Sequence, residues 1–364
     1  MSAIQPYKQV LNFLMEIIEQ APNEPNYRLP SERMLAIKFR ASRRSVRMAY
    51  EKLLSQGIVE KIHGKGYFTT GKSKHKHAAL TEKSVHLIAP YFHTRFSQEI
   101  AHGVFDFCNE HTMDLSIKLS MGNLSKEAQY IQSAFSSNVK GIILFPTDNE
   151  LINHELLKLS ANRYPIAIID RYFKNVNSSF ISTDNYGAMM DAVRFLSAKK
   201  HKRILYLTSP TSLATTVEER LNGYLAGYAK YFGEGGERTV LTLQNFGISD
   251  VAKAVHTHLT AHPDTEVLLT SGSRTAIDAI VATANKLGLS FPKDLKLMVF
   301  DNEFSDTEIH LLRPYVIQQD ARQIGYQAAS TLYNQIYGDL RTKTIRLPAH
   351  IVDYTKAEEL PTLQ

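Results

Sequence analysis

Basic side chains gather in one short stretch near the start of the sequence, Leu29 to Phe68, which reads LPSERMLAIKFRASRRSVRMAYEKLLSQGIVEKIHGKGYF. Its central run, Ser42 to Arg47, offers arginines that can donate to phosphate oxygens and to the edge of guanine. A second basic group follows at His63-Gly64-Lys65-Gly66, where two glycines let the backbone approach a phosphate closely. These residue types at this spacing predict nucleic-acid binding.

Two short helices and a hairpin are expected to present these groups. Pro30, Ser31 and Glu32 are typical of a helix start, and Ser42 is a suitable N-cap for the next helix. Apolar residues recur at helical spacing in both helices and predict their buried faces. These residues are Met34, Leu35 and Ile37 in the first helix, and Val46, Tyr50, Leu53 and Leu54 in the second.

With an amphipathic helix over Pro6–Glu19, the stretch has the layout of a winged helix-turn-helix. Its second short helix would place N-terminal residues against base edges, and the turn between Ile58-Val59 and Tyr67-Phe68 would form the wing. The alternative is a structural helical hairpin with solvated arginines. Residues 1–77 carry 14 Lys/Arg and 6 Asp/Glu, a net of +8, while the rest of the chain is at −2. The charge therefore favours a polyanionic partner for the first domain alone.

From Val85 onward, short apolar runs rich in β-branched residues alternate with amphipathic segments of helical length. Such alternation predicts an α/β body with parallel sheets covered by helices. The expected strands are Val85–Ala89, Leu115–Leu119, Gly141–Phe145, Ile166–Ile169, Ile204–Leu207, Val240–Leu243, Val267–Leu269 and Leu297–Phe300. The stretch between the two domains, residues 71–84, has no apolar periodicity and is expected to be a linker.

Polar residues follow several of these strands, where ligands bind in parallel α/β folds. Asp170-Arg171 follows one strand, Asp301 follows another, and Arg220 opens an expected helix. A carboxylate accepts hydrogen bonds and a guanidinium donates them, so together they suit vicinal hydroxyls, and Phe96 would supply a flat apolar wall for a sugar ring. Purely structural Asp–Arg pairs are the alternative.

The first domain resembles the winged-helix domain of GntR-family regulators over roughly Pro6 to Thr70. The matching residues are Leu29-Pro30-Ser31-Glu32-Arg33, Ser42-Arg43, Val46-Arg47, Gly57 and Gly64-Lys65-Gly66-Tyr67. The resemblance implies that the first of the two short helices, the start of the second and the wing touch operator DNA. The implied DNA-binding residues are Arg33, Ser42, Arg43, Arg44, Ser45, Arg47, His63, Gly64 and Lys65.

The body resembles the effector domain of LacI/GalR regulators, which is similar to periplasmic sugar-binding proteins. The supporting segments are 168–171, 183–187, 201–204, 220–224, 299–302 and 317–320. The resemblance implies a domain over 85–354 that binds an effector and dimerises. Its first lobe would hold about 85–182 and 320–340, its second about 184–316 and 342–354, and the crossings would lie near Thr183, Gln318 and Arg341.

The same resemblance implies which side chains touch the effector. The positions are Phe96, Asp170, Arg171, Arg220, Asp301 and Gln319. One departure is Gly272-Ser273-Arg274, where the family usually has Asn-Asp, so Arg274 is expected to substitute for a missing hydrogen-bonding arm.

Other classes of function lack support in the sequence. A single cysteine, Cys108, gives no disulfide framework, and neither a secretory leader nor an apolar run of membrane-spanning length is present, so a cytoplasmic protein is expected. No phosphate-binding loop, metalloprotease motif or nucleophile elbow occurs, and His256, His258 and His262 read as a polar helix end. No enzyme activity, cofactor or metal is predicted.

The expected function is a cytoplasmic, sugar-controlled repressor of carbohydrate-utilisation genes that binds palindromic operator DNA as a homodimer. A GntR-type head on a LacI-like body resembles the arabinose-repressor type, which makes L-arabinose and L-fucose candidate effectors. Two alternatives stay open: a sugar-binding protein for transport or chemosensing, and a GntR regulator with an aminotransferase-like body.

Overall fold

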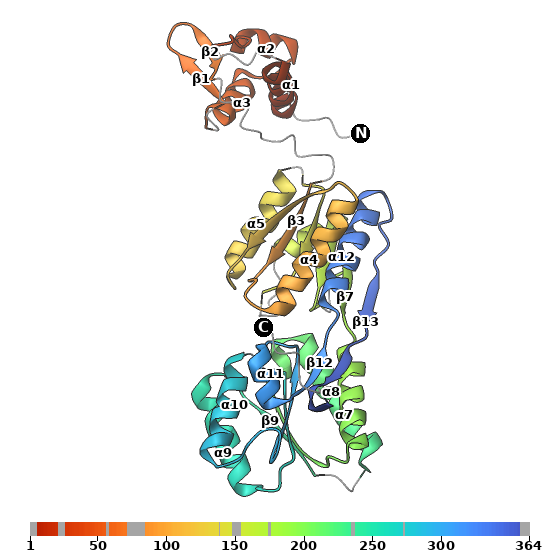
Figure 1. Ribbon diagram of the computed structural model, residues 1–364. Coiled ribbons are helices and arrows are strands. Elements are labelled where there is room, and N and C mark those ends of the chain that lie inside the picture. The colour runs from red at the N-terminus through yellow and green to blue at the C-terminus, as the bar shows by residue number, and fades with distance from the viewer. Residues whose placement is uncertain are drawn as a thin grey trace, which may run out of the picture. The chain divides into compact units, whose positions relative to one another are not determined.

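The chain forms two compact units, Met1–Thr81 and Glu82–Gln364, in the computed structural model shown in Figure 1. The structure describes residues 6–20, 26–55, 58–70, 84–137, 139–147, 154–173, 176–233, 237–271 and 274–356. Residues 71–83 of the expected linker, as well as Gly57 and Gly272-Ser273, lie outside these ranges.

The first unit has three helices followed by a hairpin. They are α1 (Pro6–Gln20), α2 (Glu32–Lys38), α3 (Arg43–Ser55), β1 (Val59–Ile62) and β2 (Gly66–Thr69), and the two strands pair antiparallel. Val10, Leu14, Leu35, Val46 and Tyr50 are fully buried in one cluster that joins all three helices. This cluster fixes how α3 and the wing are presented, because α3 buries one face and leaves the other to solvent.

The start of α2 confirms the expected capping by Ser31 but leaves Pro30 outside the helix. Its N-cap is Ser31, whose hydroxyl accepts from the Met34 amide at 3.3 Å, so Pro30 precedes the helix rather than opening it. Of the apolar face that was predicted, only Leu35 is buried, while Met34 is 49% exposed and Ile37 is 70% exposed. The reason is that α2 has only seven residues and meets α1 and α3 through a single side.

The second unit contains two lobes, each built on a six-stranded sheet. In the first lobe the order is β13-β7-β6-β5-β3-β4, and every pairing is parallel. Its strands are β3 (Ser84–Ala89), β4 (Asp114–Leu119), β5 (Gly141–Leu144), β6 (Ile166–Ile169), β7 (Ser179–Thr183) and β13 (Thr344–Leu347). Its helices are α4 (Arg95–Glu110), α5 (Leu124–Ser136), α6 (His154–Ala161) and α12 (Ala321–Ile336).

The second lobe repeats this plan with the order β14-β12-β11-β10-β8-β9. Its pairings are parallel except β12–β14. Its strands are β8 (Arg203–Thr208), β9 (Glu237–Thr242), β10 (Val267–Thr270), β11 (Lys296–Phe300), β12 (Tyr315–Gln318) and β14 (His350–Asp353). Its helices are α7 (Asn185–Ala198), α8 (Thr215–Tyr231), α9 (Ile248–Ala261), α10 (Arg274–Lys286) and α11 (Asp306–Leu312), and 3-10 turns lie at Thr211–Leu213 and Tyr354–Lys356.

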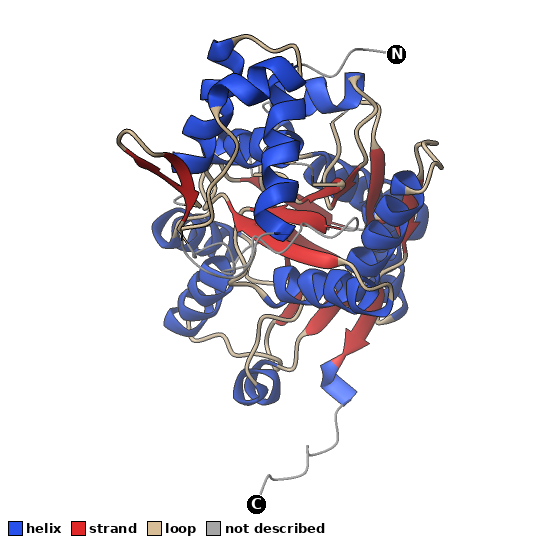
Figure 2. Cartoon of the chain, turned by 90° about the horizontal axis from the view of Figure 1, so that it is seen from above, coloured by secondary structure: helices blue, strands red, loops and turns tan. Residues whose placement is uncertain are grey.

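Both sheets are buried on both faces, as parallel sheets require. In the first lobe α4 and α12 pack on one face and α5 and α6 on the other. In the second lobe α9 and α10 cover one face and α7 and α8 the other. Figure 2 shows the strands lying among these helices. No helix within the described ranges has the length and apolar character needed to span a membrane.

The polypeptide crosses between the lobes three times. The first crossing follows Thr183, where β7 ends and α7 begins, and the second lies between β12 and α12. The third was expected near Arg341, with 342–354 in the second lobe, and this boundary was wrong. Thr344–Leu347 pairs with β7 in the first lobe, so the crossing comes after Leu347. The sequence gives little sign of β13, because only alternate residues of this edge strand are half-buried.

Helices α4 and α12 of the first lobe cross at two glycines. A Cβ built on Gly103 would lie 1.8 Å from the Arg322 carbonyl oxygen, and one on Gly325 would lie 2.0 Å from the Ile100 carbonyl oxygen. Neither contact can be relieved by a side-chain rotation, because both involve backbone atoms.

We therefore expect Gly325→Ala to push the two helices apart and to lower the free energy of unfolding of the body by about 1–3 kcal/mol. Gly247→Ala is the matched control, since its nearest atom lies 3.9 Å away and its φ is −71°. Urea unfolding of both variants checks this. Equal stability of Gly325→Ala and wild type would contradict the close helix crossing.

Candidate functional site

The surface predicted to meet DNA is built by the start of α3 and by the wing. Ser42 caps α3, with its hydroxyl accepting from the Ser45 amide at 3.1 Å. Eight of the nine predicted DNA-binding residues are exposed, and Ser45 is half-buried. At the wing tip, Gly64 and Gly66 have φ of +74° and +112°, a conformation that favours glycine. The structure leaves these side chains accessible, and their contacts with DNA stay predictions.

Arg47 is tied to a residue that the sequence did not single out. Its guanidinium lies 3.5 Å from the Glu32 carboxylate, which also accepts from the Tyr67 hydroxyl at 2.7 Å. The Tyr67 hydrogen bond and the Arg47 charge hold the pKa of Glu32 below its usual value. Arg47 remains 60% exposed, so this ion pair is weak and leaves the arginine available to DNA. The pairing spans 15 residues, which no local spacing rule reveals.

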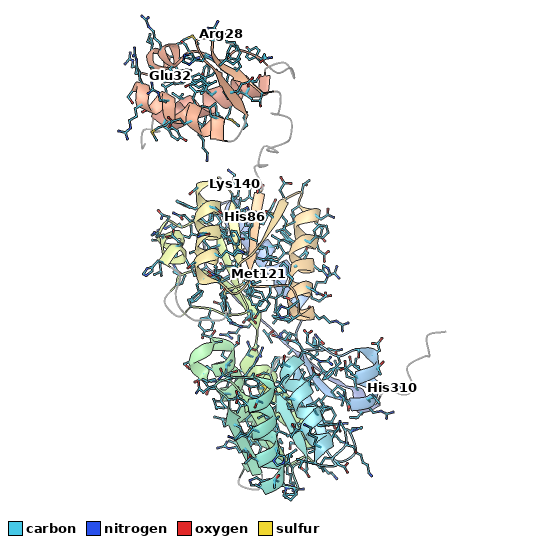
Figure 3. The ribbon with its side chains drawn as sticks, turned by 90° about the vertical axis from the view of Figure 1, so that its left-hand side faces the viewer. Arg28, Glu32, His86, Met121, Lys140 and His310 are labelled. Atoms are coloured by element: carbon cyan, nitrogen blue, oxygen red, sulfur yellow. The ribbon has the colours of Figure 1, made fainter. Side chains whose placement is uncertain are left out.

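Arg28 is a further cation on this unit. It forms an isolated antiparallel bridge with Phe68 of β2, and its side chain passes beside Gly66. Figure 3 labels Arg28 and Glu32 on the first unit. The position of Arg28 next to the wing depends on a contact between residues 40 positions apart, so sequence spacing could not indicate it.

In the body, Asp170 and Asp301 occupy equivalent places in the two lobes. Each directly follows a buried strand, β6 or β11, and each has a positive φ, +68° and +63°. Their amides donate to the neighbouring strand at 3.0 Å, to Ile181 and Ile317 respectively. Both carboxylates therefore sit at the carboxyl ends of their sheets, as the sequence predicted.

Arg220 lies in the second turn of α8, because the helix begins at Thr215 and not at Arg220 as expected. Its Nε donates to Asn185 Oδ1 at 2.7 Å, and its guanidinium carbon lies 3.7 Å from the centre of the Phe300 ring. Burial lowers the pKa of the guanidinium, and the charges of Asp170 and Asp301 counteract this. Asn185 and Phe300 thus hold the arginine, and the charges of both strand-end carboxylates act on it.

Asp301 is held by Gln319, another residue that was predicted for the site. Gln319 Nε2 donates to Asp301 Oδ2 at 2.7 Å, and the Gln319 amide lies 3.4 Å from Oδ1. Burial raises the pKa of the Asp301 carboxyl to about 6, although Arg220 and these hydrogen bonds act in the opposite direction. The carboxylate is therefore ionised at neutral pH and protonated in mild acid.

A cavity of about 410 Å³ lies between the lobes next to this group. Three predicted residues line it: Phe96 of α4, Asp301 after β11, and Gln319 at the second crossing. The remaining lining residues are Arg95, Glu99, Asn302, Gln318, Asp320, Ala321 and Arg322. Asp170 and Arg220 do not line the cavity, but their charges act on Asp301 in its wall: Arg220 lowers the pKa of that carboxyl and Asp170 raises it.

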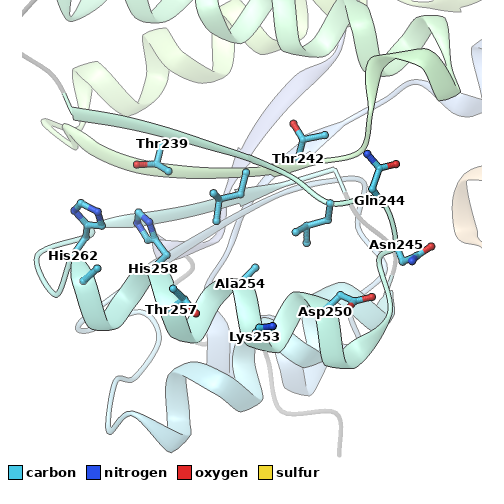
Figure 4. Close-up of a pocket in the computed structure, with 13 residues that line it drawn as sticks. Thr239, Thr242, Gln244, Asn245, Asp250, Lys253, Ala254, Thr257, His258 and His262 are labelled. Carbon is cyan, nitrogen blue, oxygen red and sulfur yellow. The ribbon is translucent and has the colours of Figure 1, made fainter.

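A larger cavity of about 640 Å³ lies between β9 and α9, as Figure 4 shows. Leu241, Leu243 and Ala254 give it a largely apolar wall, and none of the seven predicted effector contacts lines it. We take the smaller cavity as the candidate site, because converging charged and amide groups specify a polar ligand better than volume does. His258 and His262 lie at the larger one, where their rings stack 4.8 Å apart.

Arg171 and Arg274, two further predicted residues, do not line the 410 Å³ cavity. Arg171 lies 3.3 Å from the Asp170 carboxylate. Arg274, expected to reach the effector, binds the carboxylates of Asp278 and Glu308 and the Glu303 carbonyl oxygen, and it does not line the 410 Å³ cavity. Arg274 opens α10, where Asp278 one turn later and Glu308 on α11 hold its guanidinium, and its contact with an effector stays a prediction.

Known proteins match both parts of the chain. Residues 82–358 match the family described as periplasmic binding proteins and sugar binding domain of LacI family, and residues 6–69 match bacterial regulatory proteins of the gntR family. The first of these matches leaves no support for an aminotransferase-like body.

Among curated relatives, an arabinose metabolism transcriptional repressor of Halalkalibacterium halodurans is 23% identical over 56% of this chain and 55% of its own length. The chain thus spans about half the length of this relative. One of the same name from Geobacillus stearothermophilus is 21% identical over 91% of both chains. The crystal structure of GanP, a glucose-galactose binding protein from Geobacillus stearothermophilus, superposes with a TM-score of 0.64 at 15% identity, covering 75% of this chain and 98% of that one.

The last similarity shows the fold alone, whereas the family match covers most of the chain. The chain therefore belongs to the family of periplasmic binding proteins and LacI-type sugar-binding domains, and it carries this domain behind a GntR-type DNA-binding domain.

Proposed function

We propose that this protein is a DNA-binding repressor of carbohydrate-utilisation genes, controlled by a sugar that binds between the lobes of its body. The observation that carries the proposal is that Asp301 and Gln319 are hydrogen-bonded in the wall of the interlobe cavity, with the charges of Asp170 and Arg220 acting on Asp301. Carboxylates accept from sugar hydroxyls, and a guanidinium and an amide donate to them. The names of the relatives support a role in sugar metabolism.

The GntR-type unit would bind a palindromic operator as a homodimer, with one α3 helix in the major groove of each half-site. Arginines at the start of α3 would read base edges, and Lys65 and the remaining cations would neutralise phosphates. DNA as the partner places this action in the cytoplasm.

The sugar would control DNA binding by favouring one arrangement of the lobes. It can do so only by the difference between its affinities for the two arrangements. L-Arabinose and L-fucose are the first candidates: two relatives are named for arabinose metabolism, and L-fucose is proposed from the family resemblance alone.

The DNA-binding role predicts that Arg43→Ala weakens operator binding by about 1–3 kcal/mol, since a base or phosphate contact of an exposed arginine is lost. Arg194→Ala, an exposed arginine of α7 in the body, is the matched control. Fluorescence anisotropy with an operator selected from genomic DNA gives both affinities. Equal binding by Arg43→Ala and the control would overturn the assignment of α3.

The sugar-binding role predicts a rise in melting temperature with at least one member of a panel of pentoses, deoxyhexoses, uronic acids and their phosphates. A ligand at 100 times its Kd adds about 2.7 kcal/mol to the stability of the native state. Asp301→Asn removes the acceptor charge and should abolish the shift. A sugar that stabilises this variant as strongly as wild type would place the site elsewhere.

The pKa of Asp301 predicts how the affinity for that sugar depends on pH. Ionised Asp301 accepts hydrogen bonds from the sugar, so binding should weaken as pH falls from 7.5 through about 6 to 5. Isothermal titration calorimetry of the wild-type protein across this range measures the effect, and its circular dichroism spectrum at each pH is the control for folding. Affinity that is constant across the range would contradict a direct contact.

A further inference from the structure

The first and second crossings between the lobes are joined by a hydrogen bond. The Thr183 hydroxyl donates to Gln319 Oε1 at 2.6 Å. Thr183 ends β7 in the first lobe, and Gln319 follows β12 in the second. Both residues are buried, with exposed fractions of 1% and 4%. A short bond between two buried side chains at adjacent crossings constrains the torsions about which the lobes must rotate.

This bond belongs to a longer chain that ends on the charged groups of the candidate site. On one side, Gln319 Nε2 donates to Asp301 Oδ2 at 2.7 Å. On the other, Asn185 Nδ2 donates to the Thr183 carbonyl at 3.1 Å, and Asn185 Oδ1 accepts from Arg220 Nε at 2.7 Å. Asn185 is fully buried. The carboxylate and the guanidinium are thus both connected to Thr183.

The direction of each bond is fixed by chemistry. A carboxylate only accepts, so the Gln319 amide must turn its NH₂ group toward Asp301 and its oxygen toward Thr183. The Thr183 hydroxyl is the donor that satisfies this oxygen in the structure. Without this hydroxyl, the buried Gln319 oxygen would have no donor. The unsatisfied oxygen would favour rotation of the Gln319 amide away from Asp301.

We propose that Thr183 and Asn185 are positioning residues that couple the effector site to the crossings. Neither residue lines the 410 Å³ cavity. Thr183 orients the Gln319 amide, which holds Asp301, and Asn185 holds Arg220 against the first crossing. A sugar that rearranges the Asp301 and Arg220 side chains thereby acts directly on the two crossings. This inference rests on the proposed function for the identity of the ligand, but the hydrogen-bonded chain itself can be tested without one.

The first test measures the distance between the lobes in the full-length protein. Spin labels are placed at Lys126→Cys on α5 and Lys253→Cys on α9, both exposed. Cys108 stays unlabelled, because it is buried and burial raises the pKa of its thiol to about 11. Double electron–electron resonance is recorded for wild type, Thr183→Val and Thr183→Ser. Thr283→Val is the matched control, since its buried hydroxyl donates to the Ala279 carbonyl within α10.

Loss of the Thr183 hydroxyl should broaden or shift the distance distribution. Thr183→Ser, which keeps the donor, and Thr283→Val should both reproduce the wild-type distribution. A distribution for Thr183→Val that matches wild type would overturn the proposal, as would broadening in Thr283→Val of the same size. If Thr183→Val does not fold, Thr183→Ala removes the same donor with less bulk and is judged by the same criterion.

The second test uses L-arabinose as the probe, with calorimetry on the same variants. Thr183→Val should bind about tenfold more weakly than wild type, because one buried acceptor loses its donor, and Thr183→Ser should recover wild-type affinity. Equal affinity of Thr183→Val and wild type would contradict the link to the site. If L-arabinose does not bind wild type, the proposed ligand fails, and the distance measurement still decides the present proposal.

Discussion

The candidate site depends on one electrostatic constraint, the buried charge of Arg220. A guanidinium removed from water is costly unless it is paired and hydrogen-bonded. Arg220 meets this demand with Asn185, the face of Phe300 and the charges of Asp170 and Asp301. These partners come from both lobes. A change in the arrangement of the lobes would therefore change the charges that surround Arg220.

The same constraint explains two unusual backbone conformations. Asp170 and Asp301 both have a positive φ, which is costly for most residues but tolerated by Asp. In each lobe the amide still bonds to the next strand, so the turn does not disrupt the sheet. Positive φ at equivalent positions of two similar sheets indicates a shared geometric need, the presentation of a carboxylate at the strand end. A ligand with several hydroxyls can then donate hydrogen bonds to these carboxylates in place of their present protein partners.

Much of this could be predicted from the sequence, because it depends on local patterns. The helix-turn-helix, the caps at Ser31 and Ser42 and the buried central strands follow from periodicity and residue type. What failed depends on distant neighbours. Which residues of α2 are buried depends on the side of the helix that meets α3. The sequence of β13 lacks a run of buried apolar residues, because this is an edge strand. Local spacing did not indicate that Glu308 would hold Arg274, 34 positions away, and the Thr183–Gln319 bond joins residues 136 positions apart.

If the ligand site controls the DNA site, thermodynamic linkage between the two can be measured directly. Binding free energies of two coupled ligands must change each other by the same amount. Calorimetry should measure sugar affinity with and without saturating operator DNA, and anisotropy should measure operator affinity with and without saturating sugar. Coupled sites require that operator DNA changes the sugar affinity by the same factor by which sugar changes the operator affinity, and that this factor differs from one. A sugar affinity that is the same with and without operator would show that the interlobe site and the DNA-binding unit are uncoupled.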